Sequence, residues 1–299
     1  MRLFCILSLL FVALSAVAQT DYSLFWRKDS VQIEEIISDE AVQYKKVGHH
    51  GPAVENSYMA LRLYFNDSGA IDIYSKANPG LELRKYLWYP TKDQIAAGAG
   101  CDEYRVGKSV GLGGISLWDT REKCEVKLVA TKGREARVRR IEGGAQMEML
   151  SKGVAYMGEM VDIRVRVTVR DNDRTALIEA DCVSGQSVQF MTGVNHHNGQ
   201  QVDIKLSHNL IGSKPGLITV WGVHPADVVE NPLPIGAALQ FNMRAWNALK
   251  PCVEKTDDMC RIVSKKATHA EVQVMAACSR EIGITDAELF QHLAKMTFK

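Results

Sequence analysis

The sequence has almost no excess of charge of either sign, because 36 Lys and Arg stand against 35 Asp and Glu and leave a formal net charge of +1. Proteins that bind nucleic acid usually carry a strong basic excess, so no nucleic-acid partner is expected. No hydrophobic run beyond residue 18 is long enough to span a bilayer, so no membrane anchor is expected. The seven cysteines form no C-x-x-C pair, which excludes zinc-knuckle and thioredoxin-type sites.

Motifs for phosphate, cofactors and metals are also scarce. Gly107-Lys108-Ser109 looks like the end of a phosphate loop, but that motif needs glycine at position 102, where Asp102 stands. The alternation of strands and helices that a phosphate loop or a serine-hydrolase elbow requires is missing. Adjacent His196 and His197 would point to opposite sides of a strand, although either could pair with His208 on a metal. No cofactor and no metal are expected.

Residues 1–18 have the pattern of a secretory signal peptide. Arg2 supplies the positive start, Leu3–Leu14 is apolar apart from one serine, and Ala16-Val17-Ala18 is an A-x-A cleavage site. The apolar run is too short for a spanning helix. Cleavage after Ala18 would leave 281 residues (299 − 18), and we expect this mature chain to be periplasmic or secreted.

Export bears on the six cysteines that remain after residue 18. An even number permits disulfide bonds in an exported protein, and six cysteines allow fifteen pairings among which sequence does not choose. Cys252 and Cys260 are the closest pair. Buried free thiols are the alternative.

Alternation of apolar and polar residues dominates the middle of the chain. In Val161–Arg170 it continues over ten positions, which predicts a long strand with one buried face. Residues 171–174 predict a turn, after which 175–182 pairs back, and similar runs recur along the chain. This pattern predicts an all-β fold, an antiparallel β-sandwich over residues 19–250.

After Pro251 the pattern changes. Glu271–Cys278 and Thr285–Met296 are predicted as short helices, with Thr285 or Asp286 capping the second. Residues 251–299 are therefore expected to form a small helical segment appended to the sandwich.

The candidate active site centres on residues 47–64, VGHHGPAVENSYMALRLY. A glycine-bracketed loop carries the two histidines, and Glu55 follows before a strand that carries Arg62 and Tyr64. Asn66–Gly69 consists of residues that favour a turn, and the alternating run 70–74 follows it, so the two alternating runs are predicted to form a hairpin. In simple register the hairpin would place Arg62 and Tyr64 on one face with Asp72 and Tyr74.

These residue types suit acid–base chemistry on an acidic sugar. A histidine can take or give a proton near neutral pH, and an arginine can neutralise a carboxylate. Removal of the proton next to a uronate carboxylate needs that combination. The alternative is a structural turn whose imidazoles cap backbone groups. The catalytic candidates are His49 and His50 as acid or base, Arg62 as carboxylate clamp, and Glu55, Tyr64 and Asp72 beside them.

Residues 78–100 are loop-like and rich in aromatics. Such rings could stack against the C–H face of a sugar, or they could fold into the core. Asp102 could form a carboxylate pair for glycoside hydrolysis with Asp72 or Glu103. The substrate-binding candidates are Tyr86, Trp88, Tyr89, Asp102 and Lys108.

Several motifs together resemble the bacterial domain of unknown function 4861 family. They are the loop 48–56, the two hairpin strands at 61–65 and 70–76, the run 104–114 and the pentapeptide WGVHP at 221–225. The resemblance implies an exported protein of a polysaccharide-degrading bacterium, with a galactose-mutarotase-like or lyase-like β supersandwich. Its implied context is uronate-containing glycans.

We therefore expect an exported carbohydrate-active protein that processes uronate-containing oligo- or polysaccharides as a lyase, epimerase or hydrolase, with a carbohydrate ligand as its partner. A non-catalytic carbohydrate-binding β-sandwich is the alternative. A structural or partner-binding sandwich is the third.

Overall fold

A computed structural model of the chain describes residues 19–87, 89–206 and 215–298. The predicted signal peptide, Trp88 and His208 lie outside these residues.

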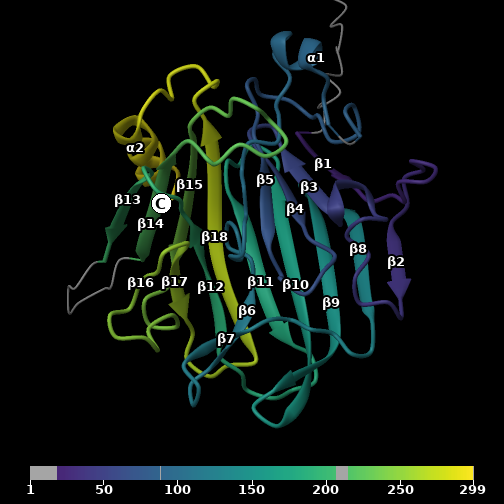
Figure 1. Cartoon of the computed structure of the whole chain (residues 1–299), viewed down its shortest axis with the longest axis vertical. Coiled ribbons are helices and arrows are strands. Elements are labelled where there is room, and N and C mark those ends of the chain that lie inside the picture. The colour runs from purple at the N-terminus through teal and green to yellow at the C-terminus, as the bar shows by residue number, and fades with distance from the viewer. Residues whose placement is uncertain (1–18, 88, 207–214, 299) are drawn as a thin grey trace, which may run out of the picture.

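The largest layer is a nine-stranded sheet in which each neighbouring pair is antiparallel (Figure 1). Its order is β13-β14-β15-β18-β11-β10-β9-β8-β2. The bounds along that order are Gln201–Lys205, Gly216–Gly222, Ile235–Phe241, His269–Cys278, Ala176–Cys182, Glu159–Arg170, Gly144–Tyr156, Arg134–Ile141 and Glu35–Ser38.

Two smaller antiparallel sheets pack on this layer. The first has the order β1-β3-β4-β5, with bounds Thr20–Ser23, Ala53–Asn56, Ala60–Leu63 and Ile71–Tyr74. The second has the order β16-β17-β12-β6-β7, with bounds Glu254–Lys255, Met259–Val263, Phe190–Asn195, Ser116–Asp119 and Cys124–Val126. The predicted antiparallel β fold is confirmed.

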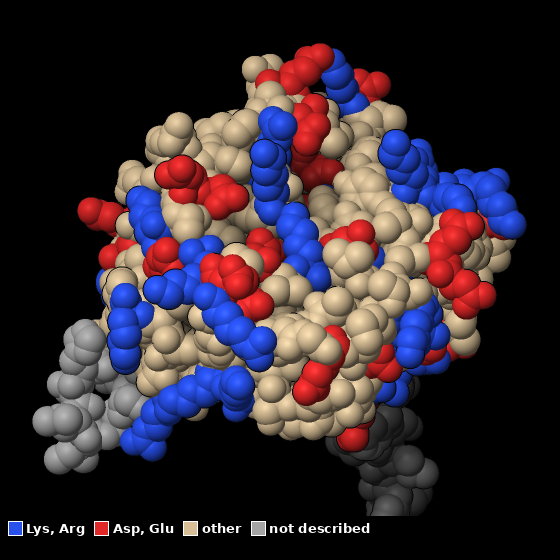
Figure 2. All heavy atoms as spheres, turned by 60° about the horizontal axis from the view of Figure 1, so that its bottom comes forward, with Lys and Arg blue, Asp and Glu red and all other residues tan. Residues whose placement is uncertain are grey.

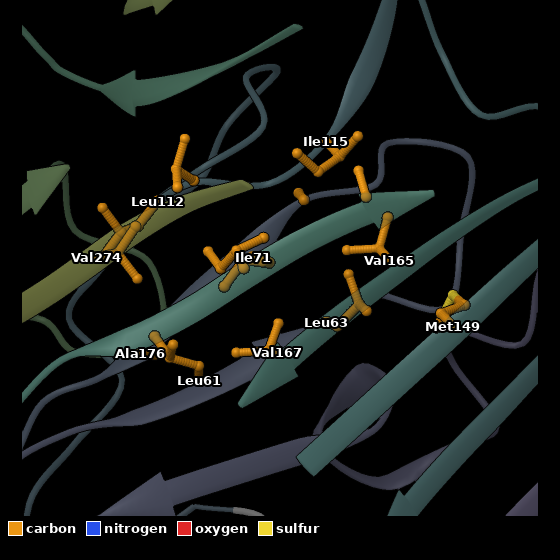
Figure 3. Close-up of a cluster of buried hydrophobic side chains, with 14 of the residues drawn as sticks. Leu61, Leu63, Ile71, Leu112, Ile115, Met149, Val165, Val167, Ala176 and Val274 are labelled. Atoms are coloured by element: carbon orange, nitrogen blue, oxygen red, sulfur yellow. The ribbon is translucent and has the colours of Figure 1, made fainter. Parts of the chain in front are cut away.

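The main core lies between the sheets. Figure 3 shows Leu61, Leu63 and Ile71 of the small sheet facing Val165 and Val167 of β10, and all five are buried. The alternation predicted for 161–170 is observed, because Val161, Ile163, Val165, Val167 and Val169 all enter this core. Burial of such branched side chains contributes about 1.5–3 kcal/mol each, so the hairpin of β4 and β5 is held firmly.

The C-terminal segment corrects one prediction. Helix α2 (Ala287–Thr297), capped by the Asp286 side chain, confirms the second predicted helix. The helix predicted at 271–278 is wrong, because these residues belong to β18, which lies between β15 and β11 in the large sheet. Ala270, Val272 and Val274 alternate into the core, and the partner strands that select this conformation are distant in sequence. Residues 251–299 thus contribute β16, β17 and β18 to the two sheets, and only α2 forms the predicted helical part.

Helix α2 covers the outer face of the large sheet. Phe290 stacks on Trp221 of β14 with ring centroids 5.7 Å apart, and Gly236 of β15 leaves room for its ring. In the part of the chain that the structure describes, no helix is long and apolar enough to cross a membrane.

The six described cysteines are all free thiols. The Cys252 thiol donates a hydrogen bond to the carbonyl of Trp246 at 2.9 Å, and Cys260 is buried in the core. The bridge between these two, considered from their spacing, is therefore not formed.

Charges of both signs are interspersed over the surface. On the face shown in Figure 2, Lys and Arg lie among Asp and Glu without a large field of one sign, in keeping with the net charge of +1. Ion pairs between exposed side chains such as these contribute about 0–1 kcal/mol each.

Candidate active site

A cavity of about 350 Å³ opens beside the hairpin of β4 and β5. Four segments that are distant in sequence build its wall: the loop at 44–50, the hairpin, the stretch 89–107 and the loop 225–232. The residues that line it are Tyr44, His50, Tyr64, Asp72, Tyr89, Asp102, Glu103, Tyr104, Arg105, Val106, Gly107, Pro225, Asp227, Val228, Val229 and Pro232.

The hairpin has the register expected from its turn. Arg62 and Asp72 are directly opposite each other on β4 and β5, and the Tyr64 amide bonds the carbonyl of Ala70. Tyr74 is opposite Ala60 and its hydroxyl bonds Glu82. Tyr64 and Asp72 therefore reach the cavity, whereas Tyr74 is not part of its lining.

Arg62 lies behind the cavity wall. Its side chain is 1% exposed, and one guanidinium nitrogen is paired with both Asp72 and Asp102, the latter at 2.6 Å. A buried cation is tolerated when it is paired in this way, and the pairing leaves the guanidinium committed to the protein. Arg62 does not line the cavity, so it is placed to organise carboxylates and not to clamp a substrate carboxylate.

Two carboxylates thus compete for one guanidinium nitrogen. Burial, together with the neighbouring Asp102 and against the attraction of Arg62, raises the pKa of Asp72 to about 7. The Tyr64 hydroxyl lies 2.5 Å from Asp72 Oδ2, and the Ile73 amide donates to Oδ1 at 2.8 Å. Tyr64 and Asp72 can therefore hand a proton between them near neutral pH.

The two histidines occupy a strained turn, η1 (Gly48–His50). His49 and His50 both have positive φ, 54° and 62°, a region that costs non-glycine residues energy. The flanking glycines are required by close approach, since a Cβ on Gly48 would meet the Phe25 ring at 2.1 Å and one on Gly51 would meet the Leu63 carbonyl at 1.9 Å. The turn fixes the direction of both imidazoles.

His50 points into the cavity in a defined tautomer. Its Nδ1 lies 2.9 Å from the Tyr44 carbonyl, which can only accept, so Nδ1 carries the proton. Burial lowers the pKa of His50, so the ring is neutral at pH 7 and Nε2 is an acceptor. The Tyr89 hydroxyl, 3.2 Å away, therefore donates to Nε2. The Tyr44 ring stacks on His50 with centroids 3.8 Å apart.

His49 turns away from the cavity. Its Nε2 lies 3.2 Å from the Ser23 hydroxyl, and its ring meets the edge of Phe25. Burial, aided by the positive charge of Arg62, lowers the pKa of His49 to about 3. The structure gives this histidine a place in the core.

Glu55 is also internal. It forms a fully buried ion pair with Lys76, and its carboxylate accepts the backbone N–H groups of Glu82 and Leu83 at 2.8 and 2.9 Å. These bonds tie the loop after β5 to the sheet. The carboxylate does not line the cavity.

Only some of the predicted substrate-binding residues lie at the cavity. Tyr89 and Asp102 line the cavity. Tyr86 and Lys108 do not line it. The Tyr86 ring lies under the Lys85 ammonium, which is 4.8 Å from the ring centroid, and Lys108 is exposed. Trp88 lies outside the described residues.

Sequence reasoning missed Tyr44, Tyr104, Arg105 and the loop 225–232 as parts of the wall. The peptide WGVHP gave a signal, because His224 packs against the Tyr104 ring at 4.4 Å and accepts the Arg105 amide at 3.2 Å. Glu103 was considered only for hydrolysis. Its carboxylate accepts from Arg280 at 2.5 Å and from the Ser75 hydroxyl at 2.8 Å.

A second hollow of about 350 Å³ continues from the first. The two share Tyr89, Asp102, Val228 and Val229, so they form one cleft. Lys92 and Arg280 bring positive charge to its outer part, and Lys92 reaches across to Glu230 at 3.3 Å. The cleft has room for more than one sugar unit.

Two other chemistries find no support in the described residues. Gly107–Gly111 fits the pattern G-x-S-x-G, but Ser109 is buried in a turn, where its hydroxyl donates to Val106 and accepts from the Gly111 amide. No group of three His, Cys, Asp or Glu side chains within 19–87, 89–206 and 215–298 is arranged to hold a metal ion.

Comparison with known proteins places the chain in a family. The model of the family described as "Domain of unknown function (DUF4861)" matches residues 16–297, nearly the whole chain. The chain belongs to this family. The resemblance seen in its motifs is thereby confirmed.

No curated protein matches this DUF4861 member. Among solved structures, the crystal structure of 4-alpha-glucanotransferase from Thermococcus litoralis is similar, with a TM-score of 0.34 and 10% identity over 83% of this chain. The chain corresponds to 40% of the length of that structure. A likeness this weak carries no functional argument.

The chemistry available to this DUF4861 member is read from its own cavity. Two of the tyrosines that line the cavity have hydroxyls in contact with a group that can exchange a proton: Tyr89 with neutral His50, and Tyr64 with Asp72. Paired relays of this kind suit reactions in which one proton leaves the substrate and another is delivered to it.

Proposed function

We propose that the chain is an exported enzyme that cleaves or epimerises uronate-containing oligo- or polysaccharides by acid–base chemistry in this cavity. The observation that carries the proposal is the presence of two tyrosine relays, Tyr89 with His50 and Tyr64 with Asp72, in one wall. Export rests on the signal pattern of residues 1–18.

Tyr89 and His50 supply the base. As the Tyr89 oxygen takes the proton from the carbon next to the uronate carboxylate, its own proton passes to His50 Nε2. The hydrogen bond from Nδ1 to the Tyr44 carbonyl stabilises the imidazolium that results. The lowered pKa of His50 keeps this acceptor unprotonated at neutral pH.

Tyr64 and Asp72 supply the acid. The pKa of about 7 lets Asp72 hold a proton at neutral pH, while Arg62 remains neutralised by Asp102. The Tyr64 hydroxyl gives its own proton to the substrate and takes the proton of Asp72 in its place. A buried carboxyl with a raised pKa is the usual general acid in sugar chemistry.

Arg105 takes the role of partner for the substrate carboxylate. It is the arginine in the lining of the main cavity, about half exposed, and it forms a loose ion pair of 4.0 Å with Asp227. A guanidinium that is wet and weakly paired is free to bind a carboxylate, in contrast to buried Arg62.

In the elimination reaction the bonds balance as follows. The C5–H bond breaks and its proton goes to the base, and the electron pair forms the C4=C5 double bond. The C4–O bond breaks, and the leaving oxygen takes the proton of the acid. In epimerisation the acid returns a proton to C5 instead, and no bond to oxygen breaks.

Hydrolysis is the second candidate. It is favoured by the placement of Asp72, whose pKa is raised to about 7, and Asp102 on one guanidinium nitrogen, which brings two carboxyls together at the wall. Glycoside hydrolysis needs a pair of carboxyl groups, one as general acid and the other as base or nucleophile.

A panel of uronate glycans and matched neutral glycans separates these reactions. Elimination gives ultraviolet absorbance of the unsaturated product together with new reducing ends. Hydrolysis gives reducing ends alone, and epimerisation gives deuterium uptake from heavy water at C5. If none of these appears on any glycan, and binding to glycans persists in His50→Gln, the enzyme proposal is wrong and the binding-module alternative gains.

A further inference from the structure

The inner wall of the cavity holds a polar group that the protein itself does not satisfy. Tyr104 is 3% exposed, and its buried hydroxyl has no hydrogen-bond partner among residues 19–87, 89–206 and 215–298. A buried hydroxyl left unpaired costs folding energy, and a native site that keeps one calls for an explanation. Two other tyrosines of the same wall offer a contrast, because the Tyr64 hydroxyl contacts Asp72 and the Tyr89 hydroxyl contacts His50.

The ring of Tyr104 is positioned from the side. His224 packs on it at 4.4 Å, and His224 is itself held by accepting the Arg105 amide and by the edge of the His197 ring at 4.9 Å. The His197 Nε2 in turn donates to the Arg105 carbonyl at 2.9 Å. The phenol is therefore fixed by ring packing, and its hydroxyl takes no part in holding the fold.

The chemistry around the hydroxyl selects its ligand. Burial and the nearby Asp72 carboxyl raise the pKa of Tyr104 well above its usual range, so the phenol keeps its proton and can both donate and accept. Asp72 and Asp102 add acceptors to the same wall. A ligand group that suits this set carries its own donors and acceptors side by side, as the vicinal hydroxyls of a pyranose do.

We propose that the Tyr104 hydroxyl is the inner subsite of the cavity, where it hydrogen-bonds a hydroxyl of the bound sugar unit. The sugar as ligand rests on the proposed function, whereas the unpaired hydroxyl does not. The subsite binds a hydroxyl group and not a carboxylate, so it can bind a neutral sugar as well as an acidic one. An analogue lacking that hydroxyl leaves Tyr104 unpaired again and binds more weakly.

The test compares Tyr104→Phe with Tyr156→Phe. Tyr156 is also buried, at 6% exposed, and lies outside the cavity lining. Its hydroxyl is used by the fold, because it donates to the Trp118 carbonyl at 3.0 Å and accepts the Gln189 amide at 3.1 Å. Each variant and the wild type are unfolded in urea, and each is titrated by calorimetry with a glucuronate-containing disaccharide and with cellobiose.

Tyr104→Phe is expected to unfold at the wild-type urea concentration or above it and to bind the glucuronate disaccharide about tenfold more weakly. Tyr156→Phe is expected to unfold at lower urea concentration and to bind as the wild type does. If Tyr104→Phe loses as much stability as Tyr156→Phe, or binds the disaccharide as tightly as the wild type, the subsite is refuted while the proposed function stands.

Wild-type binding of cellobiose alone, weakened by Tyr104→Phe, would refute the uronate part of the proposed function and support the subsite. Absence of binding of both disaccharides to the wild type would refute the sugar subsite together with the proposed function.

Discussion

Arg62 and Asp72 face each other across the β4–β5 hairpin, and both side chains are about 1% exposed. The same guanidinium nitrogen also holds Asp102, which belongs to a loop far along the chain. One buried cation therefore ties the hairpin to the cavity wall and opposes the rise in pKa that burial causes at Asp72, the carboxyl that Tyr64 contacts. The pair therefore contributes both to the stability of the fold and to the proposed proton transfer.

Replacement of Arg62 by Met should destabilise the fold strongly. Removal of one partner leaves two buried carboxyls without their cation, and the free energy of unfolding is expected to fall by about 3–5 kcal/mol. Urea unfolding at pH 7 measures it. Arg137→Met is the control: this arginine is 41% exposed and pairs with surface glutamates, so its loss should cost about 1 kcal/mol or less. Equal effects of the two would contradict the buried network.

Replacement of His49 and replacement of His50 should have different effects on turnover. His50→Gln is expected to lower turnover about 10²–10³-fold with little change in stability, because His50 is the acceptor of the Tyr89 proton. His49→Gln should leave turnover within a few-fold, since His49 contacts Ser23 and Phe25 in the core. Steady-state kinetics on the active glycan, with urea unfolding of both variants, measures this. A larger loss of turnover in His49→Gln would reverse the assignment.

Stability should depend on pH through His49. Its pKa is lowered from 6.5 to about 3 in the folded state, so below pH 6.5 the unfolded chain binds a proton that the folded chain refuses. Between pH 7 and pH 5 this group alone should remove about 2 kcal/mol from the free energy of unfolding. His49→Gln should abolish that part of the loss, while the other groups titrate alike in both proteins. Parallel pH profiles of the two proteins would show that His49 is not kept neutral by burial.

Turnover should fall as pH rises through about 7. Asp72 acts as the acid, and the raised pKa means that its proton is lost in this range. Asp72→Asn keeps the size of the side chain and one acceptor oxygen but has no transferable proton, so it should be slow and show no titration near pH 7. A wild-type rate that instead rises through this range would assign Asp72 as a base.

The sequence predicted the hairpin well because its signals are local. Two alternating runs joined by Asn66–Gly69 define the strands and their register, and so bring Arg62 opposite Asp72. The predicted helix at 271–278 failed for the opposite reason, since β18 is specified by partner strands almost a hundred residues away in the case of β11.

The site was only partly visible in the sequence. His50, Tyr64, Asp72, Tyr89 and Asp102 come together as expected from a loop beside a sheet face. What separates them from the other candidates is that they line the cavity. Sequence gives no measure of which charged side chains find a partner inside the fold instead. The core places of His49 and Glu55 and the commitment of Arg62 are of this kind.

The most direct test of the account is the ultraviolet and reducing-end assay on uronate glycans with wild type, His50→Gln and Tyr89→Phe. The account predicts product with the wild type on at least one uronate glycan and a loss of about 10²-fold or more in both variants, which should remain folded. Product formed at the wild-type rate by both variants, or no product from the wild type on any uronate glycan, would contradict it.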